Sequence, residues 1–152
     1  MKPNPLLLIV TLITIAVLPT IFPNTTLPFI TNRLLAADLP SITATELDRQ
    51  IKQNAPQILL IDVRTDKEYN TGHFPGAIHI PLKTIESGDG IDQIKSQLNR
   101  PPADKQLILY CHSGRRSAIA IHTLQKSGIP ATQLTGGIVE WKKQVDPTIL
   151  IP

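Results

Sequence analysis

The residues that could do chemistry lie together in the short segment CHSGRR, from Cys111 to Arg116. Cys111 is the only cysteine in the chain, so an internal disulfide is excluded. Most free cysteines are small buried apolar residues, but a cysteine reacts as a thiolate where cations and a helix N-terminus favour its negative charge. Two arginines and a predicted helix follow Cys111. The segment therefore predicts a reactive thiol.

The glycine in this segment indicates how the backbone could hold an anion. Gly114 tolerates the left-handed conformation that a tightly curled loop needs. Backbone N–H groups at the start of a helix can then converge on a negatively charged sulfur. Cys111 is the predicted catalytic residue. The predicted substrate-binding residues are the six that follow it: His112, Ser113, Gly114, Arg115, Arg116 and Ser117. His112 could be a proton donor or a wall of the pocket.

The segments around the loop predict a sheet that would position it. Short apolar runs typical of buried strands cover residues 57–63, 77–80, 106–110 and 131–134. Helical patterns alternate with them, over residues 43–53, 66–71, 91–98, 117–127 and 138–144. This alternation predicts an α/β domain with a mainly parallel sheet. Ligands bind beyond the carboxyl ends of such strands, and Cys111 follows the run at 106–110.

The N-terminal segment has a different composition from the rest of the chain. Lys2 precedes thirteen uncharged residues, 6–18, and this order is typical of a secretory signal. The apolar stretch 6–30 is long enough to cross a membrane if its three prolines are tolerated. We expect residues 1–37 to be a signal peptide or a membrane anchor. The domain, residues 38–152, would then lie on the non-cytoplasmic side, in a periplasm or a thylakoid lumen.

Charge and composition exclude some classes of partner. The formal net charge is +3, without a run of like charges, and basic residues do not alternate with aromatic ones. A nucleic-acid-binding protein is therefore not expected. The single cysteine and the four scattered histidines form no zinc-binding pattern. We predict neither a metal nor an organic cofactor.

Three segments of the chain resemble rhodanese domains. The segment C-x-x-G-x-R-S at Cys111 resembles their active-site loop, and it lies between LLIDVRTDKEYNTGHFPGAIHIP, from Leu59, and LTGGIVEWKK, from Leu134. The resemblance covers residues 43 to about 143. It implies a single-domain sulfurtransferase with a five-stranded, mainly parallel sheet flanked by helices. It also implies that Cys111 takes a sulfane sulfur from a donor such as thiosulfate. The resulting persulfide would pass that sulfur to cyanide or a thiol, with Arg116 orienting the anion.

Several residues outside the loop are expected to have structural roles. Arg64 can reach Glu68, so an ion pair between them is expected. His73 is expected to fix its turn by hydrogen bonds. Gly136-Gly137 indicates a turn, and Trp141 indicates a packing residue that could close part of the pocket.

Other functions stay open for the same fold. Dual-specificity phosphatases of the cell cycle resemble rhodanese domains but have five residues between the cysteine and the arginine. Here four residues separate Cys111 from Arg116, and the shorter loop suits a single sulfur atom better. An arsenate reductase is disfavoured because the chain has no second thiol to resolve an intermediate. A non-catalytic binding or sulfur-carrier module is the remaining alternative.

Overall fold

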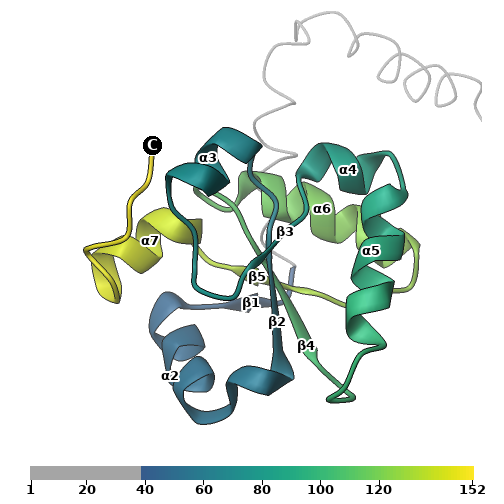
Figure 1. Ribbon diagram of the computed structural model, residues 1–152, viewed down its shortest axis with the longest axis horizontal. Coiled ribbons are helices and arrows are strands. Elements are labelled where there is room, and N and C mark those ends of the chain that lie inside the picture. Colours follow the sequence, from purple (N-terminus) through teal and green to yellow (C-terminus); the bar gives the residue numbers. More distant parts are fainter. Residues whose placement is uncertain (1–38) are drawn as a thin grey trace, which may run out of the picture. The chain divides into compact units, whose positions relative to one another are not determined.

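The computed structural model describes residues 39–152 (Figure 1). Its centre is one sheet in the order β1-β5-β4-β2-β3, and every neighbouring pair is parallel. The strands are β1 (Ser41–Ile42), β2 (Ile58–Asp62), β3 (Ile78–His79), β4 (Gln106–Tyr110) and β5 (Thr132–Leu134). The predicted α/β fold with a five-stranded parallel sheet is confirmed.

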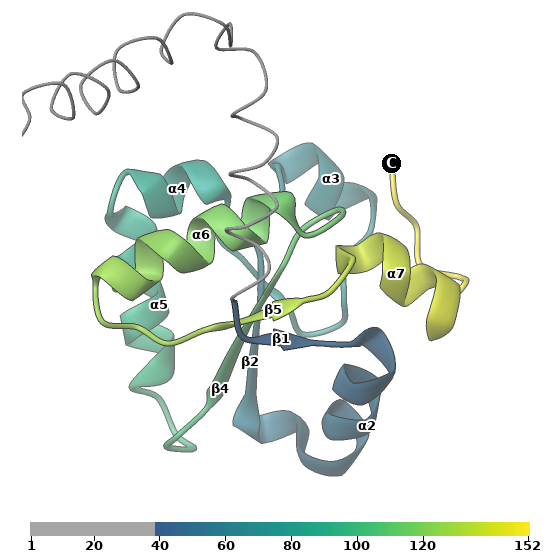
Figure 2. The ribbon, with the colours of Figure 1, turned by 180° about the vertical axis from the view of Figure 1, so that it is seen from behind.

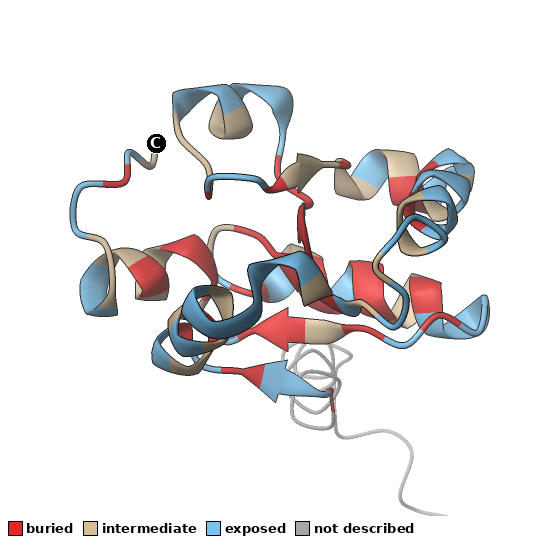
Figure 3. Ribbon diagram, turned by 60° about the horizontal axis from the view of Figure 1, so that its bottom comes forward, coloured by how far each residue is buried: buried red, intermediate tan, exposed pale blue. Residues whose placement is uncertain are grey.

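Helices cover both faces of this sheet. They are α2 (Ala44–Asn54), a 3-10 turn η2 (Ala55–Gln57), α3 (Asp66–Thr71), α4 (Leu82–Glu86), α5 (Asp89–Leu98), α6 (Arg115–Lys126) and α7 (Gly137–Gln144). Figures 1 and 2 show α2 and α7 on one side of the strands and α4, α5 and α6 on the other. In Figure 3 buried residues gather along the strands, and exposed residues lie on the outer sides of the helices.

The central strand β4 is apolar from Leu107 to Tyr110 because both of its faces are buried. Successive side chains of a strand point to opposite faces. Leu107 and Leu109 pack in the cluster beneath α5 and α6, whereas Ile108 and Tyr110 pack in the cluster beneath α2 and α7. Because both faces are covered by helices, neither set can be polar. The strand therefore carries Cys111, the next residue, to the edge of a rigid core.

The helix expected over residues 91–98 begins earlier than predicted. The order Gly88-Asp89-Gly90 suggests a loop, but α5 already begins at Asp89, and α4 just before it was not predicted. A Cβ atom on Gly90 would lie 2.8 Å from the backbone nitrogen of Ile85. Gly90 thus permits close packing of the two helices. Strand β1 was also missed, because two residues are too few for a period to be recognised.

The predicted leader, residues 1–37, lies outside the described residues. Within residues 39–152, no helix combines the length and the apolar character needed to span a bilayer.

Candidate active site

The loop after β4 leads directly into α6, as the sequence predicts. Cys111 follows Tyr110 at the carboxyl end of β4, and α6 begins at Arg115. Gly114, which caps the helix, has φ +104°, in the region that favours glycine. A Cβ atom there would lie 2.7 Å from Nε2 of Gln133, which donates a hydrogen bond to the carbonyl of Gly114 at 2.5 Å. Both the backbone conformation and this close approach require glycine.

The Cys111 sulfur has two polar neighbours within the loop. The N–H of Gly114 donates to Sγ at 3.1 Å, and the hydroxyl of Ser117 lies 3.8 Å from Sγ. That hydroxyl has one hydrogen, and the nearer acceptor is the carbonyl of Gly114 at 2.9 Å. Of these two groups, the Gly114 N–H is therefore the donor for a thiolate, while the Ser117 oxygen can accept the hydrogen of a thiol. Cys111 is 1% exposed, so bulk water is almost excluded from this sulfur.

The loop carbonyls are held by the first turn of α7. The N–H of Ile138 donates to the carbonyl of Cys111 at 2.9 Å, and the N–H of Val139 donates to that of His112 at 3.2 Å. In a trans peptide the C=O and the next N–H point in opposite directions. Fixing these two carbonyls toward α7 therefore turns the following amides to the other side of the loop. This arrangement also gives partners to N–H groups that a helix N-terminus leaves open.

Gly137, where α7 begins, permits this contact between helix and loop. It has φ +61°, and an added Cβ atom would lie 2.4 Å from the carbonyl oxygen of Cys111 and 2.6 Å from that of His112. We expect Gly137→Ala to reduce the free energy of unfolding by roughly 2 to 4 kcal/mol, measured by urea denaturation. Gly128→Ala is the matched control, because Gly128 has φ +72° and open space around it. An equal loss in the two variants would contradict a role for the close approach.

The other predicted loop residues differ in their surroundings. His112 is half-buried, whereas Ser113 and Arg115 are exposed. The guanidinium of Arg116 forms a two-pronged ion pair with Glu68 of α3, with both N···O distances at 2.6 Å. Arg116 therefore has a fixed partner outside the loop, 48 positions away in the sequence.

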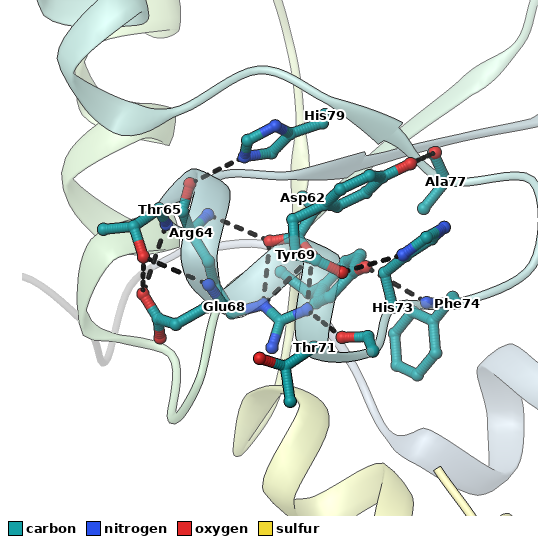
Figure 4. A network of polar contacts seen from close by, with 12 residues as sticks. Asp62, Arg64, Thr65, Glu68, Tyr69, Thr71, His73, Phe74, Ala77 and His79 are labelled. Carbon is teal, nitrogen blue, oxygen red and sulfur yellow. Dashed lines mark hydrogen bonds and ion pairs between the residues drawn. The ribbon is translucent and has the colours of Figure 1, made fainter. Parts of the chain in front are cut away.

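The predicted ion pair between Arg64 and Glu68 is wrong. Arg64 instead pairs with Asp62, at 2.7 Å between Nη2 and Oδ2, and also donates to the carbonyl of Gly72 at 2.6 Å (Figure 4). Asp62 and Arg64 are both fully buried. Glu68 is left for Arg116, whose hydrogen bonds are the main reason that the pKa of Glu68 is lowered to about 2.

The buried Asp62–Arg64 pair supports Tyr110, the residue before Cys111. The guanidinium carbon of Arg64 lies 5.7 Å from the ring centre of Tyr110, and the Tyr110 hydroxyl accepts the N–H of Phe74 at 3.3 Å. Burial, and then the negative charge of Asp62, raise the pKa of Tyr110. The phenol therefore stays neutral and holds the start of the loop.

The structural roles predicted for three other sites are confirmed. Because a carbonyl can only accept, Nδ1 of His73 donates to the carbonyl of Tyr69 at 2.9 Å and fixes the turn after α3. Gly136 and Gly137 have positive φ values, and the turn ends at Gly136, which caps α7 at its first residue, Gly137. Trp141 is buried, with its ring centre 4.6 Å from that of Phe74. Among residues 39–152 no group of three or more side chains could hold a metal ion.

Known proteins share this arrangement of elements. The family model for the rhodanese-like domain matches residues 43–144. The probable adenylyltransferase/sulfurtransferase MoeZ of Mycobacterium tuberculosis is 38% identical over 117 residues, which are 76% of this chain and 28% of MoeZ. The thiosulfate:glutathione sulfurtransferase of Saccharomyces cerevisiae is 26% identical over 110 residues, 69% of this chain and 79% of that protein. A crystal structure of a rhodanese-like domain protein from Staphylococcus aureus has a TM-score of 0.58 and 32% identity, covering 75% of this chain and 99% of that one. The chain thus spans little more than a quarter of the length of MoeZ.

Proposed function

Because the chain belongs to the rhodanese-like domain family, we propose that it is a sulfurtransferase that moves a sulfane sulfur through a persulfide on Cys111. The family and its named sulfurtransferases support a sulfurtransferase or sulfur-carrier role. The observation that carries the proposal is the single cysteine at the end of β4, with the Gly114 N–H 3.1 Å from its sulfur. That placement suits a sulfur that must hold negative charge twice, as a thiolate and as a persulfide.

The proposed reaction has two nucleophilic steps. The Cys111 thiolate attacks the outer sulfur of thiosulfate, and the S–S bond of the donor breaks. Sulfite leaves with the bonding electron pair, and Cys111 carries a persulfide anion. The carbon of cyanide then attacks the terminal sulfur, so that thiocyanate leaves and the electron pair of the second S–S bond returns to Cys111. A thiol acceptor would enter as its thiolate in the same way. Neither step requires a proton at the sulfur.

The loop supplies electrostatic stabilisation for these anions. The Gly114 N–H faces the sulfur, and the positively charged side chains of Arg115 and Arg116 lie in the first turn of α6. Preformed donors of this kind are worth most where water is excluded, as it is around a residue that is 1% exposed. We assign donor binding to the loop from His112 to Ser117, with Arg116 as its main cation.

Two other functions are separated from this one by experiment. A phosphatase would need room for a phosphate ester, which four residues between Cys111 and Arg116 restrict. A carrier or binding module would accept sulfur, or hold a partner, without turnover.

We expect the full chain to produce thiocyanate from thiosulfate and cyanide. Mass spectrometry should find one added sulfur atom on the peptide with Cys111 after thiosulfate alone.

The outcomes of this experiment are distinct. Hydrolysis of an aryl phosphate in place of sulfur transfer would favour the phosphatase. A persulfide that forms but is never passed to cyanide or to a thiol would favour the carrier module. A chain that forms neither a persulfide nor thiocyanate would overturn the proposal for these donors.

We also propose that residues 1–37 bring the domain to the non-cytoplasmic side of a membrane, in a periplasm or a thylakoid lumen. Lys2 and the apolar stretch 6–30 support this proposal, either as a cleaved signal or as a retained anchor. The intact mass of the protein recovered from its native cell, together with fractionation of that cell, tests it. A full-length chain in the cytoplasmic fraction would contradict it.

A further inference from the structure

The carboxylate of Glu68 joins two helices and is held by four donors. Arg116 of α6 contributes Nη1 and Nη2, each at 2.6 Å. Thr65, the N-cap of α3, contributes its hydroxyl at 2.8 Å and its backbone N–H at 3.2 Å (Figure 4). The N–H of Glu68 returns a bond to the Thr65 hydroxyl, which completes a capping box. Contacts within α3 and its N-cap therefore hold the carboxylate independently of Arg116.

Arg116 contacts this carboxylate from the first turn of α6, which begins four residues after Cys111. The hydrogen bonds to Glu68 are the largest cause of the raised pKa of Arg116, and Cys111 contributes less in the same direction. A free arginine side chain samples many rotamers, and fixing it costs conformational entropy. A two-pronged carboxylate contact fixes the plane of the guanidinium in advance. Arg116 is thus oriented before any donor arrives.

We propose that Glu68 is a positioning residue, which holds Arg116 in the orientation that receives an anionic sulfur donor. The inference rests on the proposed sulfurtransferase function. Within the described chain no hydrogen bond joins Glu68 to Cys111, so the effect of Glu68 on sulfur transfer passes through Arg116. Ionisation of Glu68 does not limit this role, since its pKa of about 2 keeps the carboxylate charged at every pH of interest.

A double-mutant cycle between Glu68 and Arg116 tests the proposal in the full chain. Glu68→Gln retains an acceptor for the Thr65 capping box but weakens the hold on Arg116. We expect its kcat/KM for thiosulfate to fall about tenfold, mostly through KM, because a charge-assisted pair is lost. In an Arg116→Ala background the same substitution should change kcat/KM less than about twofold.

Two further variants separate position from charge and from general damage. Glu68→Asp keeps the negative charge but shortens the side chain, so it should lower kcat/KM for thiosulfate as Glu68→Gln does. Glu46→Gln is the matched control, because Glu46 is also the third residue of its helix and pairs with Arg49 of that same helix. It should leave kcat/KM unchanged.

A second measurement does not depend on turnover. Slow rotation of a held guanidinium should give separate NMR signals for the Nη–H groups of Arg116, and these should merge in Glu68→Gln. Merged signals in the unmodified chain would overturn the positioning of Arg116. An equal fall in kcat/KM with and without Arg116, or a rise in Glu68→Gln, would overturn it too. Absence of thiocyanate from the unmodified chain would instead overturn the proposed function, with the NMR signals still testing the pair.

Discussion

A Cys111→Ser variant is expected to keep the native fold and to produce no thiocyanate above the uncatalysed rate. Serine has nearly the same size, and the Gly114 N–H that meets the sulfur at 3.1 Å can meet a hydroxyl instead. A hydroxyl is not ionised near neutral pH and cannot form a persulfide. We therefore expect kcat/KM for thiosulfate to fall by at least about a thousandfold, as for the loss of other covalent nucleophiles.

The control for this prediction is Ser96→Ala, in α5 and outside the loop. Ser96 is exposed, so the loss of its hydroxyl should leave the rate of thiocyanate formation within about twofold of the original. Circular dichroism and urea unfolding of both variants would show that the fold is intact. Persistent sulfur transfer in Cys111→Ser would mean that another group carries the sulfur, and the assignment of Cys111 would be wrong.

The position of the loop could be predicted because its determinants are consecutive in the sequence. An apolar run, a cysteine, a glycine and a helical pattern follow one another from residue 106 to residue 127. Each is a local signal, and the rule for parallel sheets places their junction at the carboxyl edge. The matched family, over residues 43–144, agrees with the range covered by the resemblance.

The ion pairs could not be predicted as easily, because they depend on which residues share an element. Arg64 and Glu68 are four positions apart, but α3 begins at Asp66, so helical spacing does not apply to them. Asp62 is the last residue of β2, and Arg64 lies two residues beyond it in a bend, so the period of the strand does not place them together either. An acidic residue and an arginine directly after a buried apolar run were the available signal for their pairing.

The partnership of Glu68 with Arg116 spans 48 positions of sequence and is created only by the fold. One local signal was available, namely the order Thr65-x-x-Glu68 before a helix, which is a capping box. It predicts where the Glu68 carboxylate is held, but not that a second arginine approaches from α6. In α2 the same spacing, from Thr43 to Glu46, leads to a pair within one helix. Tertiary packing of α3 beside the loop decides the difference.

Removal of the Arg64 charge is expected to have the largest effect on stability. In Arg64→Met the side chain keeps a similar length, but the fully buried Asp62 carboxylate loses its ion pair and the carbonyl of Gly72 loses a donor. An unpaired buried charge costs about 3 to 5 kcal/mol in free energy of unfolding, a large part of the total for a small domain. The change would be measured by urea denaturation at neutral pH.

Two controls show whether the buried charge is the cause. Arg49→Met removes an arginine of the exposed pair with Glu46, and its urea midpoint should stay close to that of the original chain. The double variant Asp62→Leu, Arg64→Met removes both charges and should recover part of the stability lost in Arg64→Met. If the double variant were no more stable than the single one, packing around Tyr110 would be the cause. Arg64 would then stabilise the loop by the packing of its side chain, whose guanidinium carbon lies 5.7 Å from the centre of the Tyr110 ring. The charges of Asp62 and Arg64 would contribute little to the free energy of unfolding.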